Sequence, residues 1–386
     1  MRLQIQNLNS IGLLFLILGP SFFSVLIGLV GLEVPASMVS LSVAIVILII
    51  IFIAKRFMIR IRFNGISQVF FVLFLLVVSF SYSYSASLSF KDDKLFWFSG
   101  LVVFPVFIII MYSLFYRVDY DRALFHRHAV ISSLLVLLVF TTVAIINPLK
   151  DVSGRLAITG LENTIYFAQA YGLSFLIIML FGRTIFPRVF YFSLVFIFGL
   201  TFFSIGSRGP VVALLVSVFY YLLKNSSFRT LLITMCVAGA LIMLLFSFSN
   251  SYLFETNFYS IYHRFDFNSQ AISTVFLNNL DGLLFGYGIG GAGVVILGRD
   301  IEFYPHNLFI EVLLEYGLLG LALFLFAVIT VLRQKNDMLI SICFIYALCF
   351  SMFSGDLVSN SLVFVFLSIL LFFRNRTSIP YNWRNL

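Results

Sequence analysis

The sequence predicts an all-α polytopic membrane protein of about 12 transmembrane helices with one large loop on the outer side. Two observations carry this prediction. Of the 386 residues, 61% are hydrophobic and 10% charged, and the mean hydropathy of +1.09 lies well outside the soluble range. Basic residues also concentrate in alternate connecting segments between long apolar runs.

The apolar runs are long enough for most of them to cross a bilayer as helices. The expected spans are 11–31, 36–54, 65–83, 95–115, 129–147, 165–182, 189–206, 210–223, 230–249, 306–332, 338–353 and 361–373. Spans 210–223, 338–353 and 361–373 are short, which suits tilted or partly re-entrant segments.

Most of the 24 Lys and Arg residues fall in the segments that this numbering places on one side. The exceptions are Lys91, Lys94, Lys150, Arg155, Arg208, Arg264 and Arg299. Because basic loops stay in the cytoplasm, both termini are expected there. The net charge of +8 therefore reflects topology, and a nucleic-acid partner is not expected.

The spans divide the chain into helices in 1–249, a large outer segment in 250–305, and further helices with a cytoplasmic tail in 306–386. The outer segment carries its own aromatic and charged residues, so a folded functional cap is expected rather than a tether. No internal repeat is evident, which disfavours an inverted-repeat transporter.

Cysteine and glycine patterns argue against a bound cofactor. The three cysteines all lie in apolar runs, which predicts neither a disulfide framework nor a metal cluster. The run GYGIGGAG at 286–293 matches G-x-G-x-x-G, but no strand–helix–strand unit surrounds it. A flexible or closely packed substrate loop around Gly288 and Gly290 is expected instead.

Residues 304–325 begin with YPHN and continue as an apolar helix that would enter the bilayer. Pro305 suits the first helical turn, where its missing N–H is not needed. Asn307, Glu311 and Glu315 recur every four residues and therefore share one face. A polar face at the boundary of the bilayer is costly and usually functional.

His306 stands at the mouth of this helix and has two interpretations. It is either a capping or network histidine, or a neutral general base, since a helix N-terminus disfavours imidazolium. Glu311 and Glu315 are expected to be orienting or structural groups.

Cationic or protonatable side chains on the outer side next to spans are Arg155, Arg208, Arg264 and His306. Each arginine alone could be a headgroup anchor. Arg208 is the strongest candidate for a phosphate site, because the glycines of SIGSRGP hold it in a tight turn and guanidinium binds phosphate through two parallel hydrogen bonds. For Arg264, neutralisation by Asp266 is the alternative.

The stretch YPHN-x-F-x-E-x-x-x-E-x-GLLG, the SRGP turn and the glycine-terminated outer loop resemble the O-antigen polymerase and O-antigen ligase superfamily of bacterial inner-membrane glycosyltransferases. The resemblance covers about 200–332 and extends to RLAITGLENTIYFAQA at 155–170. It implies a helical architecture of the lipid-linked-sugar glycosyltransferase type, no metal, and a periplasmic location for 250–305.

The resemblance also implies the substrate and the residue roles. The donor would be an oligosaccharide on undecaprenyl pyrophosphate within the membrane lipid, and a chain-length regulator protein would be a partner. Arg208 matches the family's SRG arginine and Arg264 its outer-loop arginine, although the tryptophan often found after the latter is missing here. Together with Arg155 they would bind pyrophosphate, while His306 would activate the acceptor hydroxyl.

Alternatives remain at the level of the sequence. A flippase for the same lipid-linked units would line its cavity with charges deep in several spans, whereas the spans here carry almost none. Within the enzyme class, polymerase and ligase share these motifs, and the PHN and SRGP forms favour the polymerase.

Overall fold

The computed structural model is a helical bundle. It describes residues 2–20, 22–23, 36–54, 65–115, 122–146, 149–150, 156–157, 164–204, 208–225, 251–277, 280–334, 336–353 and 356–373. Within them the only strands are the two-residue β1 (Leu149–Lys150) and β2 (Leu156–Ala157), which pair antiparallel. The expected span 230–249 and Arg155 lie outside the described residues.

Five helical stretches are long and apolar enough to cross a membrane, so the chain is a helical membrane protein by composition and helix length. They are Ile66–Tyr84, Phe90–Ser113, Ala123–Ile146, Phe167–Thr184 and Leu308–Arg333, and each coincides with an expected span. Shorter apolar helices coincide with five more. The full count of spans stays a prediction.

The first half of the chain forms α1 (Arg2–Ile17), α3 (Ala36–Ala54), α4 (Ile66–Phe80), α5 (Phe90–Phe98), α6 (Phe104–Phe115), α7 (Arg122–Ile146), α8 (Thr164–Phe181), α9 (Arg188–Ser204) and α10 (Arg208–Asn225). The second half forms α12 (Ser251–Leu277), α13 (Leu280–Phe285), α14 (Ala292–Leu297), α15 (Leu308–Arg333), α16 (Met338–Phe350) and α17 (Ser361–Phe372). Helices are the expected result, because in hydrocarbon each backbone N–H and C=O needs an internal partner.

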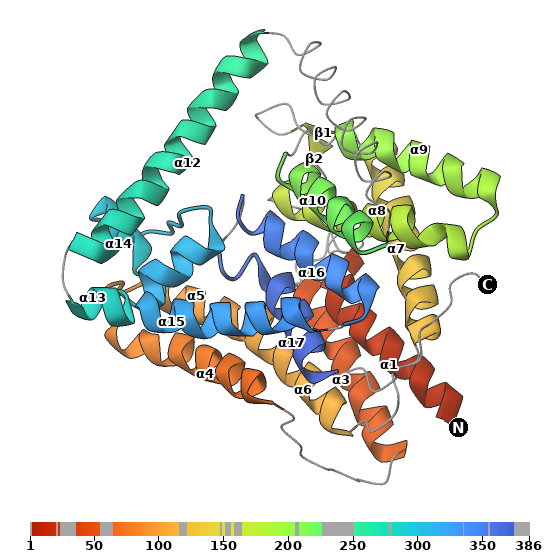
Figure 1. Ribbon diagram of the computed structural model, residues 1–386, viewed down its shortest axis with the longest axis horizontal. Helices are drawn as coiled ribbons and strands as arrows, with labels where there is room; N and C mark the ends of the chain where they lie inside the picture. Colours follow the sequence, from red (N-terminus) through yellow and green to blue (C-terminus); the bar gives the residue numbers. More distant parts are fainter. Residues whose placement is uncertain are drawn as a thin grey trace.

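Helices far apart in the sequence pack together. Helix α15 lies along α4, α10 lies against α16, and α7 packs on α1 (Figure 1). Aromatic rings join α4, α15 and α17, since Phe74 contacts both Phe324 and Phe364 at ring-centroid distances of 5.3 and 6.0 Å. This packing fixes the ends of α15 and α16, where the candidate site lies.

Residues 251–277 and 280–305, in the segment expected on the outer side, are folded. The first part of this segment is the 27-residue helix α12, which runs along the upper left edge in Figure 1 and contacts α13, α14 and α15. The short helix α13, the glycine run and the short helix α14 follow, and both helices contact α15.

Two expected helix starts are wrong. Helix α15 begins at Leu308 and not at Pro305, because the Asn307 side chain caps it by accepting hydrogen bonds from the N–H groups of Phe309 and Ile310. Helix α10 already begins at Arg208, so this arginine belongs to the first turn rather than to the preceding connection.

Helix α15 is also broken. Gly317 has φ 63° and ψ −166°, which divides the helix into residues 308–316 and a longer apolar segment. We call residues 308–316 the short segment.

Candidate functional site

The C-terminal turn of α16 brings together three separate parts of the chain. The N–H of Leu308 donates to the carbonyl of Ser351 at 3.0 Å, and Nη1 of Arg264, on α12, donates to the carbonyl of Phe353 at 2.6 Å. A Cβ atom added to Gly209 would lie 3.5 Å from Cβ of Phe353, so the start of α10 packs on the same turn. Gly209, Arg264 and Leu308, the residue that follows the PHN stretch, therefore meet at this turn.

His306 is held in a strained conformation at this point. Its φ is 56°, which makes it the one non-glycine residue with positive φ in the described chain. Such conformations cost about 1–3 kcal/mol and cluster at functional sites. Its ring lies edge-on to Tyr304, with centroids 4.7 Å apart. Its Nδ1 is buried and has no hydrogen-bond partner among the described residues, so none of their groups occupies this ring nitrogen.

The electrostatics of the site keep the histidine neutral. Burial, and then the nearby Arg264 guanidinium, lower the pKa of His306 from 6.5 to about 4. The imidazole is therefore neutral near pH 7, and burial and Arg264 both act in the direction expected for the helix terminus. A neutral imidazole with an unpartnered nitrogen can accept a proton from a hydroxyl.

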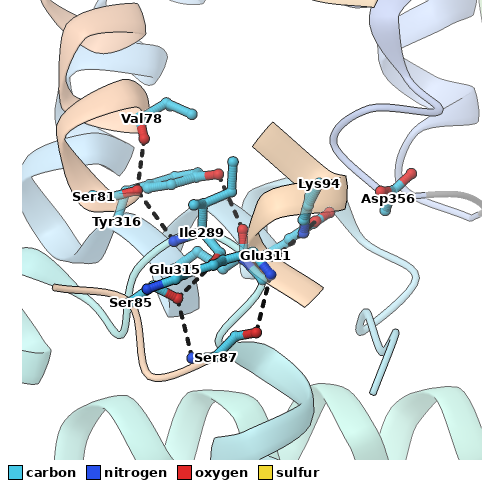
Figure 2. Close-up of polar contacts among 12 residues, drawn as sticks. Val78, Ser81, Ser85, Ser87, Lys94, Ile289, Glu311, Glu315, Tyr316 and Asp356 are labelled. Atoms are coloured by element: carbon cyan, nitrogen blue, oxygen red, sulfur yellow. Dashed lines mark hydrogen bonds and ion pairs between the residues drawn. The ribbon is translucent and has the colours of Figure 1, made fainter. Parts of the chain in front are cut away.

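Below His306, the carboxylates of the short segment share one buried lysine. Nζ of Lys94 donates to Oε1 of Glu311 at 2.5 Å and to Oε1 of Glu315 at 2.7 Å. The three side chains are at most 1% exposed. Figure 2 shows Lys94 pointing from α5 toward both carboxylates, with Tyr316 beside Glu315 and Asp356 on a separate connection. We call Lys94, Glu311 and Glu315 the Lys94 cluster.

The glycine run is packed against the break in α15. The N–H groups of Tyr287 and Gly288 donate to the carbonyls of Leu314 and Glu315 at 3.0 and 2.9 Å, and these are carbonyls that lose their helical partners at Gly317. The N–H of Gly290 donates to Oε1 of Glu315 at 3.0 Å. Of the two expected forms of this loop, the structure has the closely packed one.

Gly288 needs to be glycine for two reasons. Its φ is +78°, and an added Cβ would lie 2.4 Å from Cα of Ser85, in the connection between α4 and α5. A residue of that connection also donates a hydrogen bond to the glycine run: Oγ of Ser85 donates to the carbonyl of Ile289 at 2.7 Å. The run therefore joins the α4–α5 connection to the short segment.

The α16 turn binds the side chain of Arg264 and the backbone of Leu308, which directly follows His306 and Asn307, while Glu311 and Glu315 lie in the Lys94 cluster. The backbone of Arg208 belongs to the adjoining turn of α10, while Arg155 lies outside the described residues. Asp266, the alternative partner of Arg264, accepts a hydrogen bond from Gln270 at 3.0 Å.

Sequence reasoning missed the role of Lys94 and the buried Asp356. In the sequence, Lys94 stands out only as a basic residue that the expected topology places on the outer side, against the usual charge bias. Two carboxylates one turn apart in an apolar helix imply a buried cation, and that signal could have directed attention to it. The expectation that the spans carry almost no charged residues therefore left out Lys94, which lies in the apolar stretch Phe90–Ser113.

Among the described residues no group of histidine, cysteine and acidic side chains is arranged to hold a metal ion. Comparison with protein-family models, curated proteins and solved structures found no match to this chain.

Proposed function

We propose that the protein is a glycosyltransferase that polymerises O-antigen or a related surface polysaccharide, using repeat units carried on undecaprenyl pyrophosphate at the periplasmic face of the bacterial inner membrane. The observation that supports the proposal most is the meeting of His306, Arg264 and the start of α10 at one turn of α16. These are the parts that the resemblance assigns to the reaction.

The proposed reaction needs a base and an anion site. Neutral His306 takes the proton of the acceptor sugar's hydroxyl while the hydroxyl oxygen attacks the anomeric carbon of the donor. The bond from that carbon to the pyrophosphate oxygen breaks, and undecaprenyl pyrophosphate leaves. Arg264 and Arg208 stabilise the negative charge that develops on the leaving oxygen. Direct attack inverts the anomeric configuration.

A flippase is disfavoured by the arrangement of the buried charges. A transport pathway needs charged side chains that face a cavity. The described intramembrane charges Lys94, Glu311 and Glu315 instead bond one another and are almost fully buried.

Deletion of the gene, followed by gel electrophoresis of the lipopolysaccharide, tests the proposal. A lipid A-core carrying a single repeat unit is the result expected for loss of a polymerase. A bare core, with polymer accumulating on the lipid carrier, would assign the protein as the ligase. Unchanged lipopolysaccharide and capsule would refute both activities.

A further inference from the structure

The Lys94 cluster is a costly arrangement that the proposed reaction does not use directly. Burying charges within a membrane protein is unfavourable unless each finds a partner. Here one ammonium serves two carboxylates, and Oε2 of Glu311 has no hydrogen-bond partner among the described residues. Tyr316 and Gly290 supply further hydrogen bonds, both to Glu315, at 3.0 Å.

The short segment depends on these contacts for its direction. Because Gly317 interrupts the helix, residues 308–316 are not a rigid continuation of the spanning part of α15. One end is bound to Ser351 through the N–H of Leu308, and the other end to the glycine run. Lys94 is the side-chain contact that joins the segment to α5 (Figure 2).

A small tilt of the short segment would displace His306. At 1.5 Å per residue, Leu308 at the start of the segment lies about 10 Å from Glu315, and His306 lies two residues further out. A tilt of about 5° therefore moves His306 by about 1 Å, and a displacement of this size can lower a rate about 10²-fold.

We propose that Lys94 is a positioning residue: by bonding Glu311 and Glu315 together, it fixes the short segment and so the place of His306 relative to Arg264. This inference rests on the proposed role of His306 as the base. The competing explanation is that Lys94 only neutralises buried carboxylates.

A charge-matched variant separates the two explanations. The native cluster has a formal charge of −1, with one ammonium and two carboxylates. Lys94→Met alone leaves two carboxylates without their ammonium partner and endangers folding. The double variant Lys94→Met with Glu311→Gln has the native formal charge of −1 but lacks the ammonium that bonds residues 311 and 315 together. Lys91→Met is the matched control, because Lys91 lies on the same helix with its ammonium over the ring of Tyr82, 4.9 Å from the centroid.

In purified protein with lipid-linked repeat units, the double variant should show kcat lowered about 10²-fold with an unchanged KM for the donor. The Lys91→Met control should match the wild type in both. Wild-type kcat in the double variant would overturn the proposal and leave Lys94 as a neutralising group. A change in KM alone would also overturn it.

Hydrogen exchange gives a readout that does not depend on the reaction. Backbone amides of the short segment, and those of Gly288 and Gly290, should exchange faster in the double variant than in Lys91→Met. If the wild type lacks transferase activity but exchange still rises, the proposed function fails while the fixing of the segment stands. Unchanged exchange together with a lowered kcat would refute positioning.

Discussion

The acid side of the pH–rate profile gives the most specific test of His306. The base acts in its neutral form, so the rate should be constant at neutral pH and fall as the pH drops through the pKa of His306, which is about 4. At pH 5 about nine-tenths of such a group is neutral, against about 3% of an imidazole with the ordinary pKa of ~6.5. The two cases differ about 30-fold in the active fraction, which is easily measured.

Arg264 affects the pKa of His306, and so the pH at which the rate falls, in a known direction. Its positive charge opposes protonation of His306, so Arg264→Gln should raise the pKa and move the acid limb to higher pH. The acid limb of the rate profile should stay below the ordinary imidazole pKa of ~6.5, because burial lowers the pKa of His306 more than Arg264 does and is still present in the variant.

The assay is turnover of purified protein with lipid-linked donor from pH 3.5 to 8, with donor binding measured separately. His306→Ala should lower turnover about 10²–10⁴-fold while the donor still binds. His128→Ala, on α7, is the control and should keep wild-type turnover. Normal turnover in His306→Ala would refute the assignment of the base, whereas an acid limb near pH 6.5 in the wild type would refute the lowered pKa of His306.

Three further predictions concern the anion site, the topology and the glycine run. Arg208→Lys should lower turnover at least about tenfold at normal protein levels, because the lysine ammonium cannot make both of the hydrogen bonds that a guanidinium makes to a phosphate, and a hydrogen bond to a charged group contributes about 1.5–3 kcal/mol. Full activity in Arg208→Lys would mean that the site needs only a positive charge. Alkaline phosphatase fused after residue 280 should be active and fused after residue 335 inactive, and the reverse pattern would invert the proposed orientation. Gly288→Ala should destabilise the protein by about 2–5 kcal/mol in thermal unfolding, because it combines positive φ with a backbone clash. Gly298→Ala shares the positive φ but has no atom within 4 Å of the added Cβ, so it should cost only about 1–2 kcal/mol, and equal losses would refute the clash.

The sequence predicts the helical membrane class and the limits of many helices well, because apolar runs of the right length have few alternatives in lipid. It also singles out His306, Arg264 and the SRGP turn as candidates for a functional site. That these meet at the α16 turn does not follow from the sequence, since Ser351 and Phe353 take part only through backbone carbonyls, which every residue possesses.

Other features depend on contacts between distant residues. The break at Gly317 lies in GLLG, which is compatible with an unbroken apolar helix, and only the docked glycine run accounts for it. Lys94 lies 217 residues from Glu311, so no local pattern relates them. The left-handed conformation of His306 likewise depends on the cap at Asn307 and on the packing of Tyr304.

The break in α15 also imposes an order on the assembly of the protein. At Gly317 the carbonyls of Leu314 and Glu315 lose their helical partners, and an unbonded carbonyl in hydrocarbon costs several kcal/mol. Their donors, the N–H groups of Tyr287 and Gly288, precede them in the chain, as does Lys94. During synthesis from the N-terminus, the donors for these two carbonyls and the lysine for the two carboxylates are therefore already made when the short segment emerges, and only Ser351, the acceptor for the N–H of Leu308, follows it.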